Sequence, residues 1–197
     1  MEAAKGRWRP LLLTAIFAGL RASELRGLRW QDVDLDRADR YSAIGRPKSD
    51  AAERTVPLTP IVVNALREWK LACPKSKDGL VFPSGGGLVE HHKNIIERGL
   101  IPTMIAAGVT VKHKGPERVE VEGAKYTGLH AFRHFYASWC INRRAEGGLE
   151  LPAKVVQERL GTFVDHDDYG RLWSLVPARR RFRGACSRGK CAARIRG

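Results

Sequence analysis

A histidine and an arginine three positions apart, His130 and Arg133, are the residues best suited by type and spacing to do chemistry. They lie in an apolar stretch whose pattern predicts a helix over residues 127–142, and residues three apart share a helix face. A guanidinium matches phosphate oxygens two at a time, so the pair suits a phosphate better than a metal or a carbonyl. A second arginine, Arg21, lies in a similar setting upstream, and a lone tyrosine, Tyr169, follows downstream. Two arginines, a histidine and a tyrosine are the groups needed for phosphoryl transfer without a metal.

The charge of the chain favours a polyanionic partner. There are 35 Lys and Arg residues against 21 Asp and Glu, a net charge of +14, and nucleic acid is the simplest partner for such a protein. The last residues, 174–197, are Gly/Arg-rich with eight basic and no acidic side chains from Ala178 onward. We expect them to form a basic, disordered tail after a single domain over residues 1–173. Such a tail either binds nucleic-acid phosphates independently of sequence or has no role.

No stretch approaches the 18 apolar residues that a transmembrane helix requires, so we expect no membrane partner. The four cysteines are scattered, Cys140 is typical of buried apolar filling, and nothing near Cys186 and Cys191 completes a zinc site. A reduced, cytoplasmic protein without a metal or another cofactor is the default expectation.

Apolar periodicity and turn residues predict a mostly α fold with a small three-stranded antiparallel sheet, an α+β class. The predicted helices cover residues 10–19, 22–30, 60–71, 90–107, 127–142 and 151–160. The predicted strands are Asp32–Leu35, Tyr41–Ile44 and Arg54–Leu58, with residues 46–53 at the tip between the last two. Residues 109–125 alternate apolar and charged side chains, which is compatible with a hairpin insertion or a mobile loop.

Four motifs in order carry a family resemblance. They are Gly-Leu-Arg-Ala-Ser-Glu-Leu at 19–25, Pro-Lys-Ser…Arg-Thr-Val-Pro-Leu at 47–58, Leu-His-Ala-Phe-Arg-His at 129–134, and Val-Val-Gln-Glu-Arg-Leu-Gly at 155–161 before Tyr169. The chain resembles the tyrosine recombinases, the phage-integrase family of site-specific recombinases, in their C-terminal catalytic domain over roughly residues 10–172.

The resemblance implies a DNA breaking and rejoining enzyme acting on double-stranded DNA, as a homo-tetramer on two duplexes. Arg21 and Arg133 would hold the scissile phosphate, and His130 would be a third donor to it. Tyr169 would attack phosphorus, leaving a covalent 3′-phosphotyrosine and a free 5′-hydroxyl, while Lys48 would protonate the departing oxygen. The physical chemistry agrees, because preorganised arginines stabilise charge where it develops and covalent capture keeps the bond energy for religation.

Each assigned residue also has a structural alternative. Arg21 could cap a helix or pair with Glu24 at the surface, and Lys48 could be an ordinary solvated lysine. His130 could be a core histidine, Arg133 a surface arginine and Tyr169 a packing residue. We expect Glu24 to be an ion-pair partner that orients the arginines, and His134 to make a hydrogen bond within the fold rather than contact substrate.

Two features depart from the family pattern. The family has His or sometimes Trp directly after the Leu-Gly pair, whereas this chain has Thr162, and the interval to Tyr169 is shorter by a few residues. One lost transition-state hydrogen bond costs about 2.7–4 kcal/mol, and a nucleophile misplaced by about 1 Å costs on the order of a hundredfold in rate. His166 is nearby but lies only three residues before Tyr169. The resemblance does not include the family's N-terminal core-binding domain, which helps to hold DNA, so the chain looks like a truncated integrase. We therefore expect its DNA binding to be weak and salt-dependent.

Three functional alternatives remain at this level. The first is a catalytically impaired DNA-binding remnant of an integrase, which keeps the phosphate contacts without turnover. The second is a type IB topoisomerase-like enzyme that relaxes DNA without sequence preference. The third is an unrelated basic RNA-binding protein, against which the absence of aromatic-rich strand motifs argues.

Overall fold

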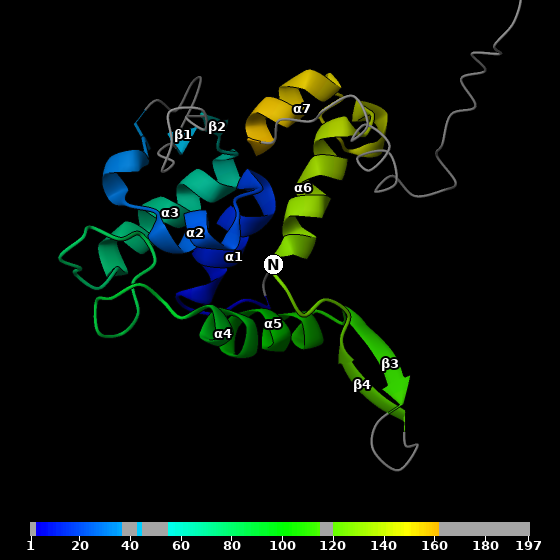
Figure 1. The fold of residues 1–197 in the computed structure, drawn as a ribbon, viewed down its shortest axis with the longest axis horizontal. Helices are drawn as coiled ribbons and strands as arrows, with labels where there is room; N and C mark the ends of the chain where they lie inside the picture. The colour runs from blue at the N-terminus through cyan, green and yellow to red at the C-terminus, as the bar shows by residue number, and fades with distance from the viewer. Residues whose placement is uncertain (1–2, 37–42, 45–54, 115–119, 162–197) are drawn as a thin grey trace, which may run out of the picture. The chain divides into compact units, whose positions relative to one another are not determined.

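The structure is a computed structural model, and it describes residues 3–36, 43–44, 55–114 and 120–161 (Figure 1). All of these belong to one unit, Met1–Val164. The predicted tail and the tip of the predicted hairpin at 46–53 lie outside the described residues.

Helix α1, Trp8–Ala18, is the centre of the core. It is buried almost all round, including Leu11, Leu12 and Leu13, because it packs against α3, Pro60–Ala72, and against α6, His130–Ile141. A helix that is apolar on every side needs neighbours on every side. This arrangement fixes the C-terminal end of α1 beside α6.

The chain turns sharply between α1 and α2, Ala22–Gly27, at Gly19, whose φ of 60° is left-handed. Helix α2 is shorter than predicted and gives way to extended backbone at Leu28. Here the chain bonds to the loop that follows α3: Val81 N–H donates to the Leu28 carbonyl at 2.8 Å, and Trp30 N–H donates to that of Gly79 at 2.9 Å.

The predicted small antiparallel sheet is present, but only two of its three predicted strands are named strands among the described residues. Strands β1, Ala43–Ile44, and β2, Val56–Pro57, pair antiparallel, with Ala43 opposite Pro57. The third predicted strand, Asp32–Leu35, is not a named strand among the described residues: a 3-10 turn, η1, Trp30–Asp32, leads into it, and Val33 alone has the backbone geometry of an isolated β-bridge. Its backbone is engaged elsewhere, since Arg67 of α3 donates to the Leu35 carbonyl.

Helix α3 begins after Thr59 with Pro60 in its first turn, as predicted, although the Thr59 hydroxyl makes no cap bond. The predicted helix over 90–107 is one helical stretch made of α4, His92–Asn94, the π-helical η3, Ile95–Leu100, and α5, Ile101–Ala106. The π segment directly precedes the turn containing Pro102, where proline cannot donate a backbone bond and crowds the preceding turn.

Residues 109–125 form a hairpin, the first of the two alternatives left by the sequence. Strand β3, Thr110–Lys114, pairs antiparallel with β4, Glu120–Ala124, and Lys112 lies opposite Glu122. The hairpin extends from the end of α5 and leads into α6 (Figure 1).

The chain then passes through the 3-10 turn η5, Arg144–Glu146, to α7, Ala153–Leu160, which packs on α6. Both helices agree with the prediction, and Cys140 of α6 is fully buried as expected. None of the helices in the described part of the chain is long and apolar enough to span a bilayer.

Candidate active site

Arg21 is held at the start of α2 by Glu24. The Arg21 backbone N–H donates to Glu24 Oε2 at 2.8 Å, and its guanidinium Nη1 donates to Oε1 at 3.0 Å. A glutamate at the third helical position commonly reaches back to the N-cap N–H in this way. The Arg21 side chain is 42% exposed, so it is fixed at its base and open to solvent. Glu24 is therefore an ion-pair partner of Arg21, as the sequence indicated.

Arg133 is buried, with only 7% of its surface exposed. Its Nη1 donates to the Gly19 carbonyl at 2.6 Å, and its Nη2 donates to the Leu160 carbonyl. Buried charged groups need such partners, because an unsatisfied one would cost several kcal/mol. The surface alternative for Arg133 is thus wrong, and the guanidinium links α6 to the ends of α1 and α7.

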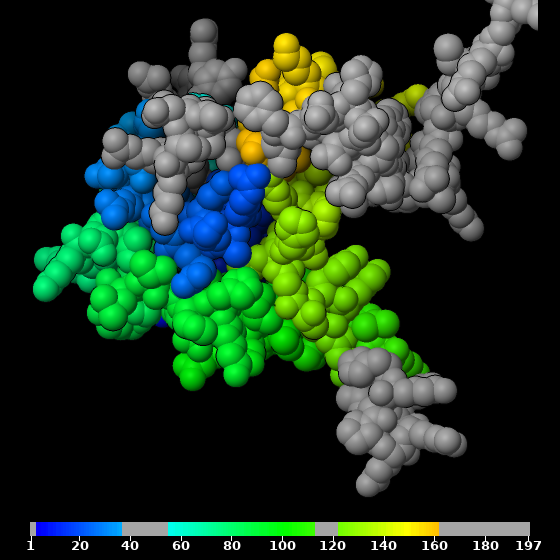
Figure 2. All heavy atoms as spheres, in the orientation of Figure 1, coloured from blue at the N-terminus to red at the C-terminus, as the bar shows by residue number. Residues whose placement is uncertain are grey.

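The two arginines meet at the C-terminal end of α7. Arg21 Nη2 donates to the Gly161 carbonyl at 3.0 Å, next along the chain from the Leu160 carbonyl that Arg133 contacts. We call Arg21 and Arg133 the arginine pair. On the face shown in Figure 2, the surface of residues 22–36 (blue) borders that of α6 (yellow-green). Residues distant in sequence thus form one cationic group.

His130 is the first residue of α6, one turn before Arg133, and is exposed. Its ring lies 4.4 Å, centroid to centroid, from that of His134, at 85° between the planes. Partial desolvation of its exposed ring, and then the positive charge of His130 and Arg133, lower the pKa of His134. His134 contacts His130 edge-to-face, and its expected hydrogen bond within the fold stays a prediction.

Two of the proposed catalytic residues, Lys48 and Tyr169, lie outside the described residues, as do Thr162 and His166. The structure thus brings together Arg21, Arg133 and the helix end at Gly161, and places His130 on the same helix as Arg133. The roles of Lys48 and Tyr169 stay predictions.

Sequence reasoning missed the contribution of Gly19. Its carbonyl is an acceptor for Arg133, and a Cβ added at this glycine would lie 2.8 Å from Cγ of Tyr136. Tyr136 is 1% exposed, so its ring has little room to move. A glycine at a helix end was readable from the sequence, but its crowding by a residue of α6 was not.

Residues 1–162 match the phage integrase family. The chain belongs to this family. Among its relatives, the tyrosine recombinase XerC of Xylella fastidiosa strain 9a5c is 35% identical over 160 residues, which cover 79% of this chain and 44% of XerC. The XerC-like tyrosine recombinase of Caldanaerobacter subterraneus subsp. tengcongensis is 28% identical over 189 residues, covering 81% and 44%. This phage integrase family chain therefore spans less than half the length of these relatives.

The fold is also that of known family members. The crystal structure of the XerH site-specific recombinase bound to difH substrate in a pre-cleavage complex superposes with a TM-score of 0.63 at 22% identity. The superposition covers 85% of this chain and 42% of XerH. The described helices and strands of this family member are thus arranged as in a tyrosine recombinase catalytic domain.

Proposed function

We propose that this protein is a site-specific DNA recombinase that cleaves and rejoins DNA through a covalent 3′-phosphotyrosine. The observation that carries the proposal is the convergence of Arg21 and Arg133 on the adjacent carbonyls of Leu160 and Gly161. Two guanidiniums held side by side form a site for a phosphate diester, whose non-bridging oxygens each accept charge-assisted hydrogen bonds.

In the proposed reaction, the Tyr169 hydroxyl loses its proton to solvent, its oxygen attacks phosphorus, and the bond from phosphorus to the 5′ oxygen breaks. Lys48 gives the departing oxygen its proton. The arginine pair and His130 stabilise the negative charge that grows on the non-bridging oxygens of the pentacovalent phosphorus. The phosphotyrosine keeps the energy of the broken bond, so attack by a 5′-hydroxyl rejoins the strand and releases Tyr169.

Double-stranded DNA is the proposed partner. The net charge of +14 supports it, and the similar XerH is described in complex with its difH substrate. A homo-tetramer on two duplexes, a catalytic domain over residues 1–173 and a basic, disordered tail over 174–197 complete the proposal.

A nicked suicide substrate tests the chemistry directly. Cleavage next to the nick releases a short fragment, so the covalent intermediate accumulates as a denaturant-resistant protein–DNA adduct. We expect the adduct with the unaltered chain and none with Tyr169→Phe, while Tyr126→Phe, an exposed tyrosine after β4, is the matched control. An adduct that persists in Tyr169→Phe would overturn the assignment of the nucleophile.

A DNA-binding remnant is the second candidate, favoured by Thr162 and the short interval before Tyr169. DNA binding without any adduct would support it. Relaxation of supercoiled plasmids of arbitrary sequence would instead support a topoisomerase-like enzyme.

A further inference from the structure

The end of α7 has an unusual hydrogen-bond arrangement. The last carbonyls of a helix lack partners within it and must find them elsewhere. The Gly161 N–H satisfies the carbonyls of Gln157 and Glu158. The carbonyls of Leu160 and Gly161 itself are left to the arginine pair, one guanidinium to each.

The backbone at Gly161 makes this possible. Gly161 has φ 57° and ψ 44°, a left-handed conformation that ends the helix and redirects the carbonyls around it. The negative end of the helix dipole adds attraction for the two cations. Helix α7 is anchored in turn, because Val156 and Leu160 are buried. The acceptors are therefore fixed in space, and each of the two guanidiniums donates to one of them.

We propose that Gly161 is a positioning residue that sets the separation of the Arg21 and Arg133 guanidiniums to that required by a single phosphate. The turn at Leu160 and Gly161 holds both cations together before the ligand arrives. A guanidinium carries five donors, so anchoring by carbonyls is compatible with binding phosphate oxygens. The inference rests on the proposed function only for the ligand, a DNA phosphate.

Glycine is required at this position because L-residues with a Cβ rarely adopt positive φ, and asparagine tolerates it better than alanine. Gly161→Ala should therefore shift the turn and its carbonyls, and Gly161→Asn should largely restore them. Gly147 provides the matched control. It ends η5 with φ 79°, its carbonyl accepts a side-chain bond from Trp139, and a Cβ there would meet nothing within 4 Å.

The first measurement reports on the guanidiniums without requiring activity. In 15N NMR spectra of arginine side chains, hydrogen-bonded guanidiniums rotate slowly and give resolved Nη signals, which Arg21→Lys and Arg133→Lys assign. We expect slow rotation of both groups in the unaltered chain, in Gly161→Asn and in Gly147→Ala, and fast rotation of at least one in Gly161→Ala. Unchanged rotation in a folded Gly161→Ala would overturn the proposal.

The second measurement is the rate of adduct formation on the nicked substrate at saturating DNA. We expect the rate to fall on the order of a hundredfold in Gly161→Ala, the effect of a displacement of about 1 Å. In Gly147→Ala the rate should stay within about twofold of that of the unaltered chain. Equal rates in these two variants would contradict the inference. If the unaltered chain forms no adduct, the proposed function fails, and the NMR measurement still decides the role of Gly161.

Discussion

Arg133 Nη1 donates a 2.6 Å hydrogen bond to the carbonyl oxygen of Gly19, the residue that ends α1. The same glycine faces the ring of Tyr136, one helical turn after Arg133 on α6. Gly19 thus determines how closely α1 approaches α6 and where the Arg133 guanidinium is anchored.

Gly19→Ala should destabilise the protein. The new Cβ would strain the positive φ by about 1–2 kcal/mol and would overlap the buried Tyr136 ring, for which overpacking costs typically about 1–3 kcal/mol. We expect the free energy of unfolding, measured in urea, to fall by roughly 2–5 kcal/mol, the sum of these two effects.

Gly6→Ala is the control for that measurement. Gly6 also has positive φ, 53°, but a Cβ there would meet nothing within 4 Å. Gly6→Ala should therefore lower the free energy of unfolding only by the backbone strain, about 1–2 kcal/mol. If both variants lose the same stability, the contact with Tyr136 does not limit the approach of α1 to α6.

Arg133→Lys should impair DNA cleavage more than its retained charge suggests. A lysine has no planar fork, so it cannot bridge the Gly19 and Leu160 carbonyls and also contact phosphate two atoms at a time. We expect the single-turnover rate of adduct formation to fall by about 10²–10³, the usual cost of one preorganised donor in a transition state.

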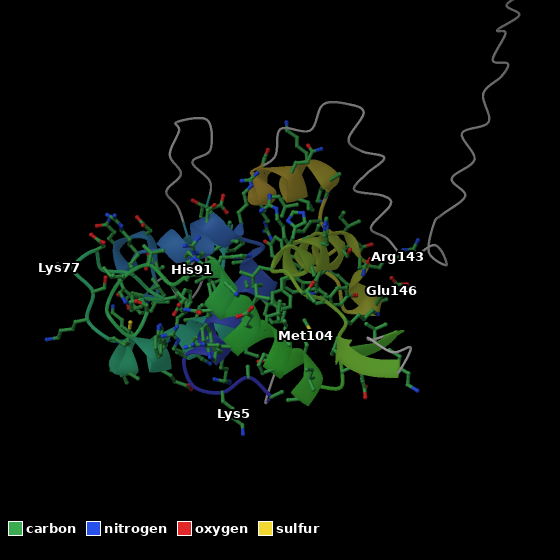
Figure 3. All side chains as sticks on the ribbon, turned by 60° about the horizontal axis from the view of Figure 1, so that its bottom comes forward. Lys5, Lys77, His91, Met104, Arg143 and Glu146 are labelled. Atoms are coloured by element: carbon green, nitrogen blue, oxygen red, sulfur yellow. The ribbon has the colours of Figure 1, made fainter. Side chains whose placement is uncertain are left out.

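Lys77→Ala removes a positive charge without touching the arginine pair, because Lys77 extends outward from the loop after α3 (Figure 3). Its adduct rate should stay within about twofold at moderate salt, since exposed charges are screened. A comparable loss in both variants would mean that the loss in Arg133→Lys is not specific to the geometry of Arg133.

The stability of the protein should depend on pH through His134. Its pKa in the folded state lies below the usual value of about 6.5 because its exposed ring is partly desolvated and has cationic neighbours. The unfolded chain therefore binds more protons in this range, so His134 contributes stability above about pH 6.5 that is lost as the pH falls through the folded pKa. Urea unfolding between pH 5 and 7 should show a shallower pH dependence in His134→Gln.

His91→Gln, at an exposed position before α4, is the comparison for this titration. A slope that changes equally in both variants would assign the effect to the removal of any histidine.

Glu90→Ala should destabilise the attachment of α1 to the helical stretch at 92–106. Glu90 is buried, pairs with Arg7 and accepts bonds from Asn94 Nδ2 at 2.9 Å and from the His91 N–H at 3.0 Å. Breaking a fully buried pair costs about 3–5 kcal/mol, and we expect roughly 2–3 kcal/mol because Arg7 is partly exposed. Thermal or urea unfolding measures the loss.

Glu97→Ala breaks the exposed Lys93–Glu97 pair of the same helical stretch, in which the charged atoms are 3.6 Å apart. It should change stability by no more than about 0.5 kcal/mol. A loss as small in Glu90→Ala would show that the buried carboxylate contributes little to holding α1.

Local sequence determined most of the helices and indicated the two arginines that the structure brings to the end of α7. The apolar spacing of 127–142 predicts α6, and the glycines at 19 and 161 stand where α1 and α7 end. Helix periodicity and capping depend on residues a few positions apart, so one sequence is enough to read them. The three-residue spacing of His130 and Arg133 likewise placed both on one helix.

Only the tertiary structure decided where the arginines anchor. Arg133 is buried between the ends of α1 and α7, and Arg21 reaches the Gly161 carbonyl across 140 positions of the chain. Similarly, Asp32–Leu35 looked like a strand, but its first residues close a 3-10 turn, with the Asp32 and Val33 N–H groups donating to the Arg29 and Trp30 carbonyls, and the Arg67 side chain bonds the Leu35 carbonyl. Hydrogen bonds between distant segments depend on how the helices pack, and no local pattern of residue types encodes that packing.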